Sequence, residues 1–237
     1  MPHRMPAPIG LHPTADLAER VLLPGDPARA LLLAESLLEG PKMFNHHRGL
    51  WGYTGLARDG EPLTIQSTGM GGPSAAIVIA ELIDLGARRL VRVGTCGALQ
   101  VHLRLGDLVS ASEAIAADGT SRALGADERI PAGADLLPAL GAAAEHAGPV
   151  VTTDLFYDPR GLERSWSDSG ALAVEMECAA LFTLAAARDV RAGALLVVSD
   201  LVLPARERID RDDLRAAEQR MGQAALGALS LVGEPER

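Results

Sequence analysis

The first residues that could do chemistry stand at Gly25-Asp26-Pro27-Ala28-Arg29, directly after a short apolar run. A glycine after a strand lets backbone N–H groups approach an anion, and the start of a helix adds a partial positive charge. Arg29, one turn into that helix, could fold back onto the same anion. The alternative is an ordinary helix cap with a surface arginine, because short motifs recur by chance.

Arg92 is a charged residue inside the apolar stretch Val91-Arg92-Val93-Gly94-Thr95. An arginine is rarely buried in a strand unless it is paired, and either a bound phosphate or a buried carboxylate would satisfy it. Thr95 and the glycine-rich turn could complete a cradle for a tetrahedral anion, and Arg48 lies in a further predicted loop. Neither glycine loop reads as a Walker A or GxGxxG motif, which disfavours nucleoside triphosphates and dinucleotides.

Two glutamates at Val174-Glu175-Met176-Glu177 precede a helix of small residues. Because side chains alternate across a strand, Glu175 and Glu177 should share one face while Met176 takes the other. A carboxylate there could accept hydrogen bonds from both hydroxyls of a ribose. The alternative is that the glutamates cap the following helix.

Ser199-Asp200 directly follows the strongly apolar run 194–198. Low-dielectric surroundings raise the pKa of a carboxyl group and suit it to donating a proton. A structural cap for the next segment is the other interpretation, since perturbed carboxylates mark sites only as a tendency.

The elements that must position these residues alternate between strand and helix signals, which predicts an α/β fold. Two strand-like runs flank Asp59-Gly60, a hairpin signal that makes the expected sheet mixed. In chain order we expect a strand at 20–23, a helix at 27–38 capped by Asp26, strands at 51–58 and 62–68, a helix opened by the loop 69–74 and reaching residue 85, strands at 90–93 and 107–116, a helix capped by Asp135 and ending at His146, a strand at 150–153, a helix at 177–189, a strand at 193–198 and a closing helix from about residue 212. The glycine loops then lie at the carboxyl ends of strands, where open α/β sheets bind ligands.

Composition narrows the class of protein. A chain of 237 residues with 48% hydrophobic and 22% charged residues fits one globular domain over residues 1–237, with disorder expected only at residues 1–10. The net charge of −9 argues against nucleic acid as a partner. A signal peptide and a membrane-spanning apolar run are not expected, which favours the cytoplasm. Cys96 and Cys178 are far apart in the sequence, and the six histidines form no pattern with metal-ligand spacing. We therefore expect no metal.

Seven ordered segments together resemble one family: PGDPAR, NHHRG, STGMGGPS, VRVGTCGA, DLFYDP, AVEMECAA and VSD. The chain resembles the nucleoside phosphorylase family that contains hexameric bacterial purine nucleoside phosphorylase and uridine phosphorylase. The resemblance implies a single domain with a central mixed twisted sheet flanked by helices, and the phosphorolysis of a purine nucleoside to free base and (deoxy)ribose 1-phosphate. It implies inorganic phosphate as co-substrate, no cofactor, and a homo-oligomer, a hexamer built as a trimer of dimers, with sites shared across each dimer.

The resemblance also implies roles for individual residues. Phosphate would be held by Gly25, Arg29, Arg92, Thr95 and a neighbouring subunit's Arg48; ribose would contact Met70, Met176, Glu177 and a neighbour's His12; and the base would lie against Phe156 and Val174, near Glu175, Ser199 and Asp200. Asp200 would protonate the leaving base, and Arg92 would act with it in catalysis. The arginine that supports Asp200 in the purine enzymes has three candidates on the closing helix: Arg211, Arg215 and Arg220.

Substrate class rests on few residues. Ser199-Asp200 is similar to the purine enzymes, whereas uridine phosphorylases carry a Gln and an Arg on a longer insert; here the segment 157–173 is short and lacks Gln. STGMGGPS resembles the uridine enzymes, so uridine phosphorolysis is the alternative. A nucleosidase related to the methylthioadenosine and adenosylhomocysteine enzymes would use water and would not need Arg29, Arg48 and Arg92. A non-catalytic nucleoside-binding protein would not need Asp200.

Overall fold

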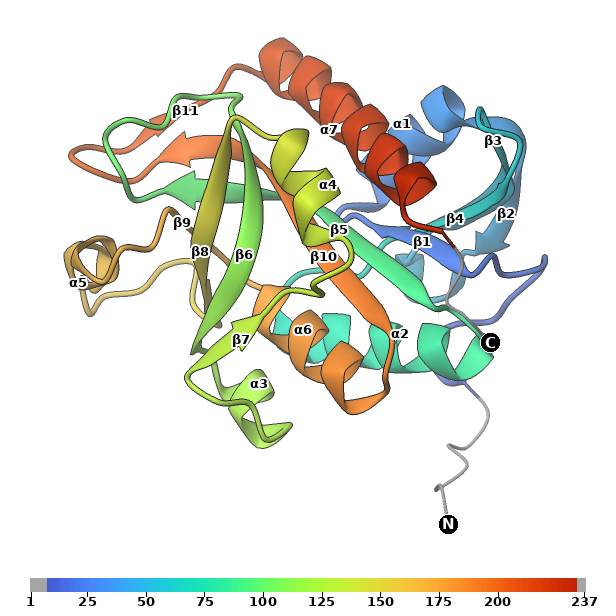
Figure 1. The fold of residues 1–237 in the computed structure, drawn as a ribbon, viewed down its shortest axis with the longest axis horizontal. Coiled ribbons are helices and arrows are strands. Elements are labelled where there is room, and N and C mark those ends of the chain that lie inside the picture. The colour runs from blue at the N-terminus through green and yellow to red at the C-terminus, as the bar shows by residue number, and fades with distance from the viewer. Residues whose placement is uncertain (1–7, 234–237) are drawn as a thin grey trace.

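The computed structural model describes residues 8–233, whose strands form one mixed sheet with helices on both sides (Figure 1). In chain order the elements are β1 (Arg20–Leu23), α1 (Pro27–Leu37), β2 (Leu38–Asn45), the short 3₁₀ turn η1 (His47–Gly49), β3 (Gly52–Ala57), β4 (Pro62–Gln66), α2 (Gly72–Leu85), β5 (Arg89–Ala98), β6 (Leu108–Ala117), α3 (Gly119–Ala123), β7 (Arg129–Pro131), α4 (Leu137–Ala142), β8 (His146–Thr153), α5 (Glu163–Asp168), β9 (Ala173–Glu175), α6 (Cys178–Ala187), β10 (Arg191–Leu201), β11 (Glu207–Arg208) and α7 (Arg211–Leu231). The predicted α/β architecture is confirmed.

Part of the sheet closes on itself. β5 pairs in parallel with β10, β10 runs antiparallel to β6, β6 and β8 are parallel, β8 and β9 are parallel, and β9 returns antiparallel to β5. β1, β4, β3 and β2 extend the sheet outward from β5. The ring brings the carboxyl ends of β5, β8 and β10 together beside β9.

Two hydrophobic cores cover the two faces of the sheet. One packs α2 and α6 beneath β5 and β10, and the other packs α1, α4 and α7 against the opposite face (Figure 1). Residues 192–198 of β10 are buried without interruption, as expected for a strand whose sheet is covered on both faces. Close approach of α1 and α7 depends on Gly222, where a Cβ would come within 2.4 Å of the Leu33 side chain.

Local signals placed several elements correctly. The Asp26 carboxylate accepts a hydrogen bond of 2.8 Å from the Ala28 N–H, and Pro27 occupies the first turn, so α1 begins where the sequence predicts. β3 and β4 form the predicted hairpin around Asp59-Gly60. α2 begins at Gly72 and ends at Leu85, as the glycine-rich loop before it indicates.

Other expectations were wrong. The segment 94–97 is not a loop but the second half of β5, because β9 and β10 hydrogen-bond to its backbone. Asp135 does not cap α4; it pairs with Arg191 at 2.9 Å, α4 stops at Ala142, and His146 already belongs to β8. The helix expected at 177–189 spans Cys178–Ala187. β2, β7, β9, β11, α3 and α5 were not anticipated.

The expected disorder of residues 1–10 can be compared with the structure only from residue 8 onward. Residues 1–7 lie outside the described residues, so their expected disorder is not addressed. Ile9 and Gly10, by contrast, donate backbone hydrogen bonds to Glu81 at 2.8 and 3.0 Å, so this part of the expected disorder was wrong. Among the helices of residues 8–233, none is both long and apolar enough to cross a membrane.

Candidate active site

A cavity of about 500 Å³ lies at the carboxyl ends of the ring strands. It is lined by the loops that follow β1 and β4, by β5, by the β9–α6 junction and by the end of β10. Twelve of the predicted site residues line it together: Gly25, Arg29, Met70, Arg92, Thr95, Phe156, Val174, Glu175, Met176, Glu177, Ser199 and Asp200. Segments from six separate parts of the sequence, including Phe156 in the segment after β8, therefore converge on one space.

One wall of the cavity is formed by two loops that touch through their backbones. The Gly69 N–H donates to the Gly25 carbonyl at 3.1 Å, and the Thr68 N–H donates to the Pro24 carbonyl at 2.9 Å. A Cβ on Gly25 would come within 3.2 Å of the Gly69 carbonyl oxygen, so only glycine fits here without a shift. Arg29 rises from the first turn of α1 beside this pair of loops.

Arg29 is held from behind by Glu218 of α7. Its Nε donates to the Glu218 carboxylate at 2.7 Å, and both side chains are nearly buried. Among residues 8–233, neither Nη atom of Arg29 has a hydrogen-bond partner. The ion pair thus fixes the guanidinium through Nε and leaves the two Nη atoms for the cavity that Arg29 lines. This arrangement is suited to binding a tetrahedral anion.

Arg92 lies across two carboxylates at the cavity floor. Its Nε donates to Glu175 at 2.9 Å, and its Nη2 forms an ion pair with Glu177. Gly94, two residues along the same strand, provides the space, because a Cβ there would lie 2.7 Å from the guanidinium. Burial alone would lower the pKa of Arg92, but the charges of Glu177 and Glu175 raise it above its ordinary value. The buried-carboxylate interpretation therefore holds for this chain.

Glu175 bonds through its carboxylate to other groups of the protein. The side chain is fully buried, and its oxygens accept from Arg92, from the Thr152 hydroxyl at 2.5 Å, and from the backbone N–H groups of Glu177 and Cys178 at 2.8 and 2.9 Å. The expected contact of Glu175 with a base stays a prediction, and the hydrogen bonds that its carboxylate makes in this structure are all to groups of the protein. Glu175 caps the start of α6 and holds Arg92.

Glu177 occupies the junction of β9 and α6 and, like Glu175, contacts Arg92. Its carboxylate also accepts a hydrogen bond of 2.6 Å from the Gly71 N–H, which ties α6 to the loop before α2. Burial raises the pKa of Glu177, while the charge of Arg92 opposes that rise. Met70, almost fully exposed, and Met176 flank this carboxylate in the cavity lining.

Asp200 stands in a β-bulge. The register between β10 and β5 shifts between Val198 and Asp200, so Ser199 is the extra residue, and bulges of this kind re-aim side chains. The Ser199 hydroxyl donates to Asp200 Oδ2 at 2.9 Å, and Arg208 Nε donates to Asp200 Oδ1 at 2.8 Å. Asp200 therefore lies within β10, beside the cavity, with two donors on its carboxylate.

The supporting arginine is not on α7. Arg208 belongs to β11 and lies directly opposite Asp200 in an antiparallel pairing. All three predicted candidates, Arg211, Arg215 and Arg220, are exposed on α7, and Arg220 donates to the Gly106 carbonyl at 2.5 Å. The expectation was wrong because the hairpin between β10 and β11 returns the chain to Asp200 before α7 begins.

The outer part of the cavity contains residues that sequence reasoning missed. Arg206 lines it and lies 5.3 Å from the centre of the half-exposed Phe156 ring, a cation–π distance. Val174 from β9 and Trp166 from α5 complete the apolar wall. With arginine supplying all but one of the basic residues, nothing in the sequence distinguishes Arg206 from a surface arginine.

Two predicted residues are not in this cavity. His12 and Arg48 are both exposed and lie together near η1, at the end of β2. The cavity lining of the single chain holds three arginines, Arg29, Arg92 and Arg206, against six carboxylates, Asp26, Asp158, Glu163, Glu175, Glu177 and Asp200. Within residues 8–233, no cluster of three or more His, Cys, Asp or Glu side chains could hold a metal.

Comparisons with known proteins agree with this geometry. The profile of the Phosphorylase superfamily matches residues 19–231. Similar curated proteins include the DeoD-type purine nucleoside phosphorylases of Geobacillus kaustophilus strain HTA426, 42% identical over 82% of this chain and 86% of the relative, and of Jannaschia sp. strain CCS1, 41% identical over 93% and 97%. The crystal structure of uridine phosphorylase from Vibrio fischeri ES114 superposes with a TM-score of 0.79 at 29% identity, covering 90% of each chain.

Proposed function

This chain belongs to the phosphorylase superfamily, and we propose that Asp200 is the general acid with which it splits nucleosides. Its activity is the phosphorolysis of purine nucleosides, a pentosyl transfer to inorganic phosphate. The observation that carries the proposal is the placement of Asp200 in a β-bulge between Ser199 and Arg208, in the same cavity as Arg29 and Arg92.

The phosphate would bind between the loops at Gly25 and Gly69, beneath Arg29. The loop backbone at Gly25 and the two Nη atoms of Arg29 would provide donors for its oxygens. Arg92 and Thr95 bound the same space from β5. Fixing the nucleophile in this way contributes to catalysis by positioning, and no covalent enzyme intermediate is required.

The ribose would lie over Glu177 and Met176. As the bond to the base lengthens, positive charge grows on the sugar, between the phosphate and the departing base. The carboxylate of Glu177, held by Gly71 and Arg92, is placed to accept the ribose hydroxyls and to stabilise that charge. Glu175 acts only through Arg92 and α6 in this scheme.

The base would lie against Phe156 and Val174 with its N7 near Asp200. Proton transfer to N7 makes the purine a better leaving group and leaves a carboxylate on Asp200. Arg208 and the Ser199 hydroxyl, each donating to one of its oxygens, stabilise that carboxylate. This pair of donors supports a purine acid catalyst over a uracil-reading site, although the similarity to uridine phosphorylase keeps uridine in the panel of substrates to test.

The proposal includes a homo-oligomer with shared sites. His12 and Arg48 are exposed and outside the cavity of their own chain, and the lining has more carboxylates than arginines, so a neighbour's Arg48 would supply needed positive charge. A cytoplasmic location belongs to the same proposal, since Cys96 and Cys178 are both free thiols, as reducing compartments favour.

The test is turnover of adenosine, inosine, guanosine and uridine with and without phosphate, followed by Asp200→Asn. The variant should lose on the order of 10²- to 10⁴-fold in kcat for inosine, the usual effect of removing an acid catalyst. It should retain turnover of 7-methylguanosine, which is already cationic at N7. Asp158→Asn is the matched control, because Asp158 lines the same cavity but is engaged by Arg160. Equal losses of inosine and 7-methylguanosine turnover in Asp200→Asn would refute proton donation.

A further inference from the structure

The exposed residues His12 and Arg48 are connected through one buried amide. Asn45, at the end of β2, is fully buried, and its Oδ1 accepts from the His12 N–H at 2.9 Å and from the His47 N–H at 3.3 Å. Its Nδ2 donates to the Leu50 carbonyl at 2.6 Å. A single side chain thus fixes the backbone at His12 and at both sides of Arg48.

The segment before His12 is anchored in the same manner by Glu81 of α2. This carboxylate, 5% exposed, accepts from three consecutive backbone N–H groups, those of Ile9, Gly10 and Leu11, at distances from 2.7 to 3.1 Å. A buried charge is costly unless it is well hydrogen-bonded. In residues 8–233 this carboxylate takes no ion pair, so its hydrogen-bonded partners are backbone groups of the segment that leads to His12.

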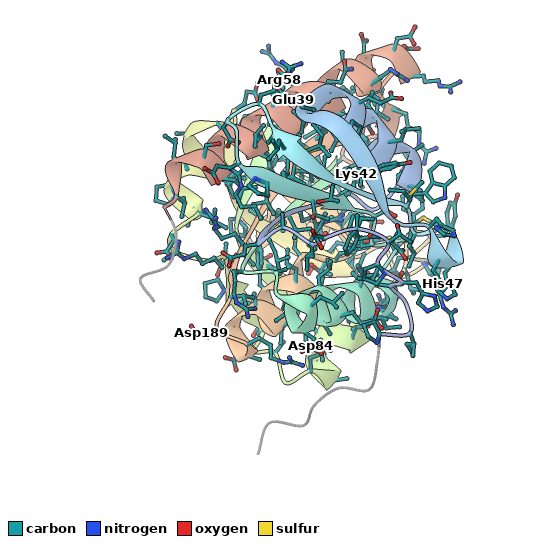
Figure 2. The ribbon with its side chains drawn as sticks, turned by 90° about the vertical axis from the view of Figure 1, so that its right-hand side faces the viewer. Glu39, Lys42, His47, Arg58, Asp84 and Asp189 are labelled. Atoms are coloured by element: carbon teal, nitrogen blue, oxygen red, sulfur yellow. The ribbon has the colours of Figure 1, made fainter. Side chains whose placement is uncertain are left out.

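The side chains at the surface are themselves ordered. The rings of His12 and His47 stack with their centroids 3.8 Å apart and their planes 12° apart. Partial desolvation, with the adjacent His12 and Arg48, lowers the pKa of His47. Arg48 itself adopts a left-handed backbone conformation, with φ of 56°. Figure 2 shows His47 at the outer edge of the molecule, beyond the strand that carries Lys42.

The Leu50 carbonyl gives a second reason to regard this region as built for rigidity. It accepts from Asn45 Nδ2 and also from Gln66 Nε2 at 2.9 Å, so two buried amides from β2 and β4 hold the end of the turn. An exposed turn needs no such support for folding, because its backbone groups can bond to water. A residue that binds a ligand from a fixed position does need this hydrogen-bonded support, because ordering a mobile side chain on binding lowers the affinity.

We propose that Asn45 and Glu81 are positioning residues that hold His12 and Arg48 as one rigid unit, presented to the cavity of a second copy of this chain. The inference rests on the shared site of the proposed function and adds the residues that make sharing possible. The occupant of the neighbour's cavity is phosphate with the ribose beside it, because Arg48 offers a cation to an anion and His12 a ring nitrogen to a hydroxyl.

Asn45→Ala and Glu81→Gln test the proposal in two independent places. Each should raise the KM for phosphate or nucleoside on the order of tenfold, with a smaller loss of kcat, because a mobile side chain has to be ordered on binding. Asn45→Ala should act on phosphate through Arg48 and also on nucleoside through His12, because Asn45 holds both segments. Glu81→Gln should act mainly on nucleoside through His12. Thr54→Val is the control: it removes a buried hydroxyl contact between β3 and β4, so it should lower the melting temperature without changing either KM.

Hybrid oligomers separate positioning from a general loss of structure. Asn45→Ala and Asp200→Asn subunits are co-expressed with different affinity tags and purified over both. In such a hybrid, the cavity of the Asn45→Ala subunit keeps Asp200 and receives His12 and Arg48 from a subunit whose Asn45 is intact. A component with the wild-type KM for phosphate should therefore reappear. Hybrids of Arg48→Ala with Asp200→Asn should regain activity by the same logic.

Two results would overturn the inference. In the first, Arg48→Ala hybrids regain activity while the Asn45→Ala hybrids keep the raised KM, which would show that Asn45 acts within its own subunit. In the second, the Arg48→Ala hybrids stay inactive and the Asn45→Ala hybrids keep the raised KM after subunit mixing is verified, which would remove the shared site itself. The proposed function fails separately, if the wild-type protein cleaves no purine nucleoside in a phosphate-dependent manner.

Discussion

Replacing Glu175 by glutamine distinguishes a supporting carboxylate from one that recognises a base. The substitution keeps the size of the side chain but replaces one accepting oxygen by an NH₂ donor. The groups around the carboxylate are themselves donors, so this NH₂ group meets no ready acceptor. The amide nitrogen fits best at the position of Oε1, because Oε2 accepts from Arg92 Nε and the Glu177 N–H at 2.9 and 2.8 Å. The Cys178 N–H, which lies 2.9 Å from Oε1 and 3.0 Å from Oε2, would then bond to Oε2 alone. The Thr152 hydroxyl, which donates to Oε1, would then have to turn and accept.

The free-energy cost of Glu175→Gln depends on the ion pair with Glu177 that Arg92 keeps. Removing one partner from a buried ion pair costs about 3–5 kcal/mol when the remaining charge is left alone. Here Glu177 still pairs with Arg92, so we expect a smaller cost of about 2–3 kcal/mol, below the range for a buried charge left alone. For a chain of this size, that loss corresponds to a fall in melting temperature of roughly 4–12 °C. Because Arg92 loses its support on the nucleophile side of the cavity, kcat/KM should fall by one common factor for every purine.

The assay is thermal unfolding together with kcat/KM for inosine, guanosine and adenosine. Thr152→Val serves as the matched control, since it removes the hydroxyl that donates to Glu175 and accepts from the Ala179 N–H without changing any charge. It should lower stability by about 1–3 kcal/mol, the cost of leaving buried polar groups unpaired. The supporting role of Glu175 is refuted if Glu175→Gln leaves the melting temperature unchanged and alters the relative rates among the three bases.

Three further substitutions test other contacts. Arg29→Ala should raise the KM for phosphate far more than that for nucleoside in steady-state kinetics, and an unchanged phosphate dependence would exclude Arg29 from the phosphate site. Arg208→Gln should lower kcat for inosine on the order of tenfold by freeing Asp200, yet change stability by less than about 1 kcal/mol because Arg208 is largely exposed; a large unfolding defect would show a structural role instead. The hydrogen bonds from Arg20 lower the pKa of Asp59, so its stabilising contribution is complete above about pH 4, the unfolded value, and is lost as pH falls toward the folded one. Urea unfolding should therefore show a stability gap between wild type and Asp59→Asn that is large at pH 7 and shrinks near pH 3, and a gap independent of pH would contradict this.

Sequence reasoning succeeded where the deciding interactions are local. Asp26 caps α1 through an N–H two residues away, and Asp59-Gly60 turns a hairpin between adjacent strands. The segments that line the cavity were identified because each carries an unusual residue type at the end of a strand or the start of a helix. Such features depend on residues that are close in the sequence, so they can be predicted without knowledge of the fold.

The contact partners of those residues could not be predicted from the sequence. Nothing local indicates that Arg92 meets Glu175, 83 residues away, or that Arg29 meets Glu218, 189 residues away. Arg208 was missed because the sheet register, and not helical spacing, brings it opposite Asp200. β5 was predicted too short because its glycines resemble a loop until the closed ring of strands supplies their hydrogen-bond partners.

The ion pair between Arg29 and Glu218 has a consequence for how the protein is made. Arg29 leaves the ribosome early, while its carboxylate partner on α7 is translated 189 residues later. Until α7 has emerged, the Arg29 guanidinium lacks Glu218, and Leu33 of α1 lacks the close contact with α7 that Gly222 allows. A nascent chain arrested before α7 would therefore hold every cavity loop and still lack an ordered Arg29. A fixed Arg29 guanidinium is therefore a property of chains that include α7.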